Sequence, residues 1–251
     1  KDLPLYPYQF QSKFRNELRS KSGLMRGREF WMKDLYSFSR TQEEHDAFYE
    51  KISEAYDRVF ERLGLGESTF KTFASGGSFA KFSHEFQTVC EAGEDWLFLN
   101  REKNVAVNEE VLDDFLAENP EFSRNDFEKV RSAEVGNIFN FGDKLALDMG
   151  LNFTNEEGKL TPVFLASYGI GVTRLVGVLA EIFSDEKGLV WPENVAPFQV
   201  YLANVGDDPE VIDFSRKVYD EFTARNIDVL WDDRSARPGE KFADAELLGI
   251  P

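Results

Sequence analysis

Residues 6–38, YPYQFQSKFRNELRSKSGLMRGREFWMKDLYSF, decide how this chain folds. Near the start of this stretch, the aromatic side chains of Tyr6, Tyr8 and Phe10 alternate with polar ones, which is the period-two pattern of a β-strand. Turn-forming residues follow at 20–23, and a second strand-like run begins after them. The stretch therefore predicts an antiparallel β-hairpin.

The predicted hairpin brings charged and aromatic side chains to one surface. Arg15 and Glu17 are two residues apart and leave the same face, while Arg26 and Phe30 share one parity on the second strand. Guanidinium groups bind phosphate oxygens, a carboxylate accepts a hydrogen bond from the amino group of adenine, and a phenyl ring stacks on a base. The set predicts a nucleoside triphosphate site; the alternative is an ordinary charged hairpin with one aromatic residue.

The amino-acid sequence of the hairpin resembles that of a known family. Residues 14–17 (FRNE) and 26–34 (RGREFWMKD) resemble motif 2 of the class II aminoacyl-tRNA synthetases. Residues 24–38 resemble the prolyl-tRNA synthetases of bacterial and organellar type. The resemblance implies a role for each of four residues: Arg15 contacts the ATP α-phosphate, Glu17 binds the adenine amino group, Arg26 holds the outer phosphates and Phe30 stacks under adenine.

A second segment, 163–174, reads VFLASYGIGVTR and joins an apolar strand to a helix. A lone GxG is weak evidence for phosphate binding, and the third glycine of a dinucleotide fingerprint is missing. The sequence of residues 169–174, GIGVTR, nevertheless resembles motif 3 of the class II synthetases. The resemblance implies that Gly169 and Gly171 let the backbone approach the nucleotide, that Arg174 reaches the γ-phosphate, and that Ser167 lies near the proline ring.

Residues 83–95, SHEFQTVCEAGED, resemble the strand that lines the amino-acid pocket of prolyl-tRNA synthetases. The resemblance implies that His84 and Glu85 lie near bound proline. From the residues alone, an internal histidine satisfied by hydrogen bonds is the alternative. In a later strand, Asn137 and Asn140 stand where the family usually has His and Gln, and both replacements keep the ability to form hydrogen bonds.

Composition limits the remaining classes of function. The chain has 251 residues, 42% of them hydrophobic, with one cysteine, Cys90, and two histidines, so neither a disulfide nor a His/Cys metal cluster is expected. A single cysteine suits a reducing cytoplasm, and no apolar run reaches membrane-spanning length. The net charge of −17 argues against a general nucleic-acid coat. Residues 1–33, which include Lys1, Arg19 and Lys21, form a local basic patch that suits ATP or an RNA end, or simply a solvated loop.

The order of patterns predicts an α/β (α+β) chain. We expect a class II synthetase-like antiparallel sheet flanked by helices over 1–190, a linker over 191–198, and the first part of an α/β anticodon-binding domain over 199–251. A helix capped by Thr41 is expected to carry His45 at its surface. Strands are expected at 199–203 and 227–231, with a helix at 209–225 between them.

The resemblance implies a proline–tRNA ligase that uses ATP and Mg²⁺, acts on proline and tRNA-Pro, and works as a cytoplasmic homodimer. Residues 107–136 leave no room for an editing domain, so a short form is expected. Motif 1 is not found, and the chain begins at Lys1, so a fragment is expected. Two alternatives stay open: a threonyl or histidyl enzyme of the same subgroup, and a non-catalytic paralogue that binds RNA or a partner.

Overall fold

The predicted hairpin is present in the computed structural model, which describes residues 2–18, 20 and 23–251. Strand β1 (Tyr8–Phe14) pairs antiparallel with β2 (Glu29–Ser39), and a short 3-10 helix, η1 (Gly23–Met25), lies between them. Lys1, Arg19 and Lys21 lie outside the described residues, as does part of the expected turn. The prediction of an antiparallel hairpin is confirmed.

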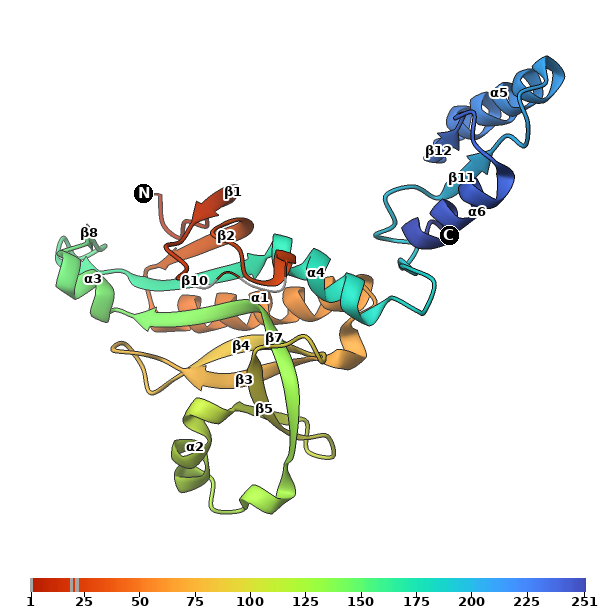
Figure 1. Ribbon diagram of the computed structural model, residues 1–251. Coiled ribbons are helices and arrows are strands. Elements are labelled where there is room, and N and C mark those ends of the chain that lie inside the picture. The colour runs from red at the N-terminus through yellow and green to blue at the C-terminus, as the bar shows by residue number, and fades with distance from the viewer. Residues whose placement is uncertain (1, 19, 21–22) are drawn as a thin grey trace. The chain divides into compact units, whose positions relative to one another are not determined.

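The hairpin forms one edge of a large sheet (Figure 1). Among the described residues, the sheet has eight strands in the order β1-β2-β10-β7-β4-β3-β6-β5, and β7 also pairs with β5. Its pairings are antiparallel except for the parallel pair β3–β6. The further strands are β3 (Thr69–Ser75), β4 (Phe82–Val89), β5 (Asp95–Asn100), β6 (Val105–Asn108), β7 (Glu128–Gly142) and β10 (Phe164–Gly171). This architecture confirms the predicted mixed fold class.

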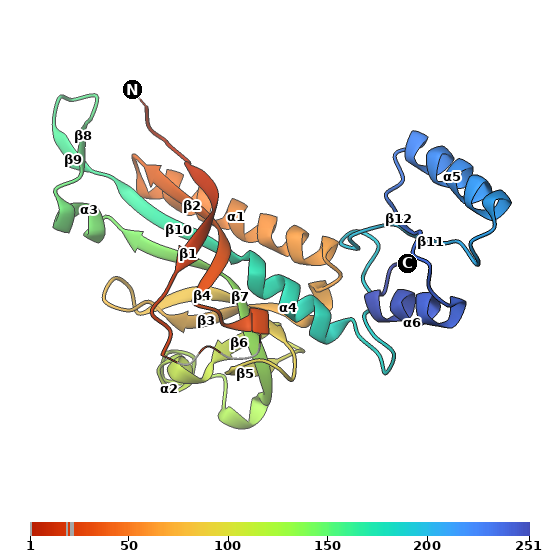
Figure 2. The same cartoon turned by 45° about the horizontal axis from the view of Figure 1, so that its top comes forward.

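Helix α1 (Gln42–Arg62) covers one face of the sheet, against β2, β10 and β7 (Figures 1 and 2). The hydroxyl of Thr41 caps it by accepting a hydrogen bond from the backbone of Glu44 at 3.2 Å. The expectation that His45 lies at the surface is wrong. His45 is fully buried, and its Nε2 lies 2.9 Å from the side-chain oxygen of Asn140 on β7, because the first turn of α1 already packs on the sheet.

Shorter elements complete the first unit. Residues 109–126 form only η3 (Glu109–Val111), the helix α2 (Leu112–Glu118) and η4 (Arg124–Asp126). Phe115 of α2 packs against Phe98 and Val107 in a small apolar cluster. The other elements are η2 (Gly66–Ser68), α3 (Lys144–Met149), and the hairpin of β8 (Asn152–Thr154) and β9 (Leu160–Pro162).

The chain divides into two compact units, 1–178 and 179–251, with the boundary inside α4 (Val172–Ile182). In the second unit, β11 (Val200–Ala203) and β12 (Val229–Asp232) pair in parallel, with α5 (Pro209–Ala224) between them and α6 (Pro238–Leu248) after them. These strands and the first helix agree with the predicted pattern. Within the described residues, no helix combines the length and apolar character needed to cross a bilayer.

Phe86→Ala is expected to destabilise the first unit by about 3–5 kcal/mol, because it empties a site between the sheet and α1. The Phe86 ring is fully buried, with its centroid 5.0 Å from that of Tyr56 and 5.4 Å from that of Phe60. Urea unfolding measures the change. Phe10→Ala, which truncates a ring that is 60% exposed on β1, is the control and should cost below about 0.5 kcal/mol. Equal losses in the two variants would contradict this packing.

Candidate active site

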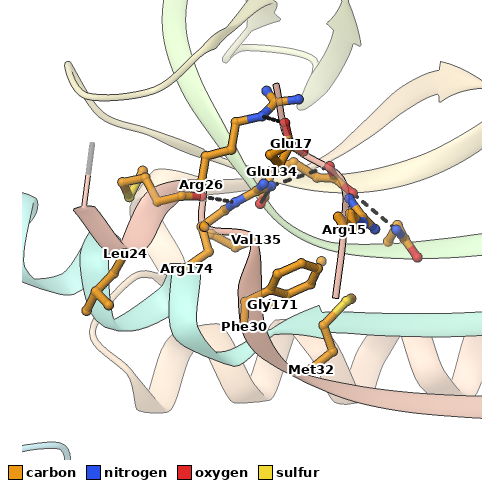
Figure 3. Close-up of a pocket in the computed structure, with 14 residues that line it drawn as sticks. Arg15, Glu17, Leu24, Arg26, Phe30, Met32, Glu134, Val135, Gly171 and Arg174 are labelled. Atoms are coloured by element: carbon orange, nitrogen blue, oxygen red, sulfur yellow. Dashed lines mark hydrogen bonds and ion pairs between the residues drawn. The ribbon is translucent and has the colours of Figure 1, made fainter. Parts of the chain in front are cut away.

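The two motifs separated in sequence line one pocket of about 550 Å³, counting the space open to solvent. Its walls come from the hairpin, β7, and the junction of β10 with α4 (Figure 3). Of the predicted nucleotide-site residues, these six line it: Arg15, Glu17, Arg26, Phe30, Gly171 and Arg174. The structure therefore brings together side chains that are nearly 160 positions apart, since Arg15 and Arg174 differ by 159 in number.

Phe30 offers a flat apolar surface within this pocket. The Arg15 guanidinium carbon lies 5.1 Å from the centre of the Phe30 ring, within the range of a cation–π contact. Met32, two residues further along β2, has the same parity and lines the pocket as well. The aromatic ring, a guanidinium and a polarisable thioether thus line the same pocket.

Arg26 bridges two carboxylates at the rim of the pocket. Its Nε donates to Glu17 at 3.1 Å, and its Nη1 donates to Glu94, which precedes β5. These hydrogen bonds, to Glu94 first and Glu17 second, raise the pKa of Arg26. Arg26 is still 43% exposed, so its charge remains accessible to an anionic ligand that can replace the carboxylates.

Arg174 is held firmly at the start of α4. Its Nε donates to the carbonyl of Met25 at 2.9 Å, and its Nη1 donates to the carbonyl of Glu134 at 2.7 Å. The Glu134 carboxylate lies 3.5 Å from the same guanidinium. Because both carbonyls belong to pocket-lining residues, Arg174 is fixed beside the pocket, as Figure 3 shows.

The two glycines of the second motif occupy different positions. Gly171 lines the pocket, and a Cβ there would lie 3.4 Å from the Cβ of Arg174. Gly169 lies beneath two lining side chains: its Cβ would lie 3.1 Å from Cε of Met32 and 3.2 Å from Oδ1 of Asn137. A larger residue at Gly169 would thus push on the pocket wall without itself facing the ligand.

His84 and Glu85 lie on opposite faces of β4, because neighbouring residues of a strand alternate. His84 faces α1, where its Nδ1 lies 2.9 Å from the hydroxyl of Tyr49, and burial lowers the pKa of His84 to about 4. Glu85 faces the other side and accepts a hydrogen bond from Gln87 at 2.9 Å. The expectation that both residues line one amino-acid pocket does not fit this geometry; His84 is an internal histidine with a hydrogen bond.

Ser167 shares a face with Glu85 rather than with His84. On β10 it pairs with Phe139 of β7, two residues from the pair of Gly169 with Asn137, and Asn137 in turn pairs with Glu85. Residues that pair directly across strands point to the same face. One row of the sheet therefore runs from Glu85 through Asn137 to Gly169, with Ser167 beside it.

Both parts of the chain match known protein families. Residues 1–183 match the family described as "tRNA synthetase class II core domain (G, H, P, S and T)", and residues 199–251 match "Anticodon binding domain". The first match covers well over half of the chain. The chain belongs to the class II aminoacyl-tRNA synthetases.

Individual proteins are similar to this synthetase chain over its whole length. It is 37% identical to the proline–tRNA ligase of Rickettsia rickettsii (strain Sheila Smith) and 38% identical to that of Rickettsia africae (strain ESF-5). It spans 62% of the length of each of these relatives. A crystal structure of prolyl-tRNA synthetase from Cryptosporidium parvum, complexed with L-proline and AMP, has the same fold, with a TM-score of 0.74 at 22% identity, over 99% of this chain and 47% of that one.

Sequence reasoning about this synthetase missed several residues at the pocket. Met32 had a usable signal, because it shares parity with Phe30. Glu94 and Glu134 had none, since their approach to the arginines depends on how β4, β5 and β7 pair. Among the described residues, no group of three or more His, Cys, Asp or Glu side chains is placed to hold a metal ion.

As pH rises, the free energy of unfolding of the Glu85→Gln variant is expected to fall less than that of the wild type. Burial, followed by the charge of Glu134, raises the pKa of Glu85 from 4.5 to about 7. Between these values the folded state binds a proton that the unfolded chain releases, so the free energy of unfolding falls with rising pH. The neutral amide removes this fall, a gain on the order of 1–3 kcal/mol at pH 8 relative to pH 5.

Urea unfolding at pH 5 and pH 8 measures this gain. The amide oxygen of the variant can still accept the hydrogen bond from Gln87, so the carboxyl charge is the main difference. Glu67→Gln, at an exposed position, is the matched control. Parallel pH profiles for wild type and Glu85→Gln would contradict the raised pKa.

Proposed function

We propose that the protein carrying this chain is a proline–tRNA ligase. In the first step, the proline carboxylate attacks the α-phosphorus of ATP, giving prolyl-adenylate and releasing pyrophosphate. In the second step, a hydroxyl of the terminal adenosine of tRNA-Pro takes the prolyl group and AMP leaves. Neither step needs a protein nucleophile, so catalysis consists of positioning and of stabilising charge at the α-phosphate.

One observation supports the proposal that the pocket binds ATP: its lining includes Arg15, Arg26 and Arg174 together with Phe30. Arg15 is assigned to the α-phosphate, Arg26 and Arg174 to the outer phosphates, and Phe30 to adenine. Glu17 is assigned to the adenine amino group, which requires it to leave Arg26 when a phosphate takes its place. Gly169 and Gly171 supply the close backbone approach.

Proline as the amino-acid substrate is supported by the names of the relatives, proline–tRNA ligases, and by the sequence of the hairpin. We assign Glu85 and Ser167 to the amino-acid side, since both share the face that Asn137 and Gly169 occupy. A threonyl or histidyl enzyme shares motifs 2 and 3, and pyrophosphate exchange with a panel of amino acids distinguishes the three. A non-catalytic paralogue is disfavoured because Arg15, Glu17 and Arg174 are all present.

Mg²⁺ suits the donors at this site. This cation keeps most of its waters and binds through one or two carboxylates together with substrate phosphates, rather than through a dedicated protein cage. Glu94 and Glu134 are the carboxylates that would hold it, since both lie beside the arginines assigned to phosphate. When bound, Mg²⁺ offsets the negative charge of the triphosphate.

The remaining assignments concern the whole protein. We propose a homodimer in the cytoplasm that binds tRNA-Pro partly through residues 199–251, which match the anticodon-binding family. The domain limits 1–190 and 199–251 also remain part of the proposal. Trp191, in the expected linker, donates a hydrogen bond to the carbonyl of Leu248 at 3.0 Å, so at least this residue is attached to the second unit.

Arg15→Ala in the complete protein is expected to cost roughly 2.7–4 kcal/mol in proline activation, the effect of removing one preorganised donor to a developing charge. Proline-dependent exchange of pyrophosphate into ATP measures the loss. Arg58→Ala removes a 62% exposed arginine of α1 whose nearest carboxylate is 3.9 Å away, and it should leave the rate unchanged. A loss under about 1 kcal/mol for Arg15→Ala would refute its assignment.

The complete protein is also expected to charge tRNA-Pro with alanine and to leave the product intact. Between β4 and β7 the described residues form only short elements, with no unit that resembles a hydrolytic domain. Proline and alanine differ little in apolar bulk, which gives only about 1–3 kcal/mol of discrimination. Incubation of purified Ala-tRNA-Pro with the protein tests this, and release of alanine by the protein alone would contradict it.

A further inference from the structure

A chain of hydrogen bonds crosses from β2 through α1 to β10 on the face opposite the pocket. Nζ of Lys33 donates to the hydroxyl of Tyr56 at 2.8 Å and to the carbonyl of Tyr168 at 2.9 Å. The Tyr56 hydroxyl donates in turn to the carbonyl of Gly169 at 3.0 Å. Two consecutive carbonyls of β10 are therefore held by one ammonium group and one phenol.

We propose that Lys33 is a positioning residue that, together with Tyr56, fixes the glycine segment of β10 beneath the nucleotide pocket. This inference rests on the function proposed above. Strand alternation explains the arrangement: Met32 and Asp34 point to the pocket side, whereas Lys33 between them points to α1. Lys33 is thus near the site in sequence and on the other face of the sheet in space.

The two carbonyls can accept these bonds without leaving the sheet. A carbonyl oxygen has two lone pairs, so it can accept a side-chain donor in addition to a backbone N–H. Gly136 on β7 provides the room: a Cβ there would lie 3.0 Å from the Gly169 oxygen and 3.2 Å from Cε2 of Tyr56. A side chain at position 136 would thus separate the phenol from the carbonyl that it holds.

Lys33 remains able to act as a cation in this buried place. Its Nζ lies 4.7 Å from the centre of the Tyr56 ring, and Asp34 is the neighbouring charge that opposes loss of the proton. Burial lowers the pKa of Lys33 to about 8, which still leaves the ammonium charged at neutral pH. A charged donor polarises the Tyr56 hydroxyl and strengthens its bond to Gly169.

The position of the glycine segment affects the pocket through short contacts. Gly169 lies against Met32 and Asn137, both of which line the pocket, and β10 continues through Gly171 to Arg174. A shift of this strand by a few tenths of an ångström changes where the pocket floor meets the nucleotide. Since neither Lys33 nor Tyr56 is among the residues that line the pocket, their effect on binding is indirect.

Steady-state pyrophosphate exchange in the complete protein tests the proposal. Lys33→Met and Tyr56→Phe are each expected to raise KM for ATP about fivefold to tenfold. The double variant is expected to be no worse than the more affected single variant, because both changes break one chain of bonds. Partial unfolding alone lowers the apparent kcat by reducing active enzyme, and it leaves KM unchanged.

Tyr49→Phe is the matched control, since it removes the same atom from the same helix. The Tyr49 hydroxyl donates to the carbonyl of Ile138 on β7 at 2.9 Å, whereas the bonds under test end on carbonyls of β10. Its KM for ATP should stay within twofold of wild type. An equal rise in KM for Tyr49→Phe, multiplicative effects in the double variant, or an unchanged KM in Lys33→Met would each overturn the positioning role. An inactive wild type would instead refute the proposed function.

Discussion

The antiparallel pairing of β2 with β10 is the constraint on which the rest of the site depends. It places Gly169 opposite Asp34 and Gly171 opposite Met32, and so joins two motifs that the sequence separates by more than a hundred residues. Because both strands alternate strictly, the pairing also sorts their side chains into two sets. One set, which includes Lys33 and Tyr168, faces α1; the other, which includes Met32 and Asp34, faces the pocket side. A slip of one residue would exchange the two sets.

The pocket must balance three arginines, Arg15, Arg26 and Arg174, in a chain of net charge −17. The protein meets this locally, since Arg26 pairs with Glu17 and Glu94, and Arg174 binds two carbonyls beside Glu134. Under the proposed assignment, phosphate oxygens replace the Glu17 and Glu94 carboxylates at Arg26, while the two carbonyls keep Arg174 in place. An anionic ligand therefore exchanges one set of oxygens for another, which requires little rearrangement of the cations. The rest of the chain carries a net negative charge, which opposes the approach of an anion.

Local pattern predicted the elements that carry this site, and it failed where long-range pairing decides. The alternation in the hairpin was sufficient for β1 and β2, whereas Arg26 lies before β2 begins and lines the same pocket as Phe30 without belonging to the strand. His45 was misplaced because a capping box marks where a helix begins without saying which turn meets the sheet. The resemblance of residues 83–95 to a strand of the amino-acid pocket put both His84 and Glu85 near proline, although neighbours in a strand face opposite ways. The approach of Glu94 to Arg26 depends on the pairing of three strands, which no local period encodes.

The two asparagines that depart from the family pattern lie on opposite faces of the sheet and make different contacts. Asn137 donates to the Glu134 carboxylate at 3.1 Å, and the same carboxylate lies 3.5 Å from Arg174. The amide thus connects the row assigned to the amino acid with an arginine assigned to ATP. Asn140, on the other face, accepts one hydrogen bond from the backbone N–H of Gly142 at 2.7 Å, and its side-chain oxygen lies 2.9 Å from Nε2 of the buried His45. A change at Asn137 would therefore alter the charge balance of the pocket. A change at Asn140 would instead alter the packing of α1 on the sheet.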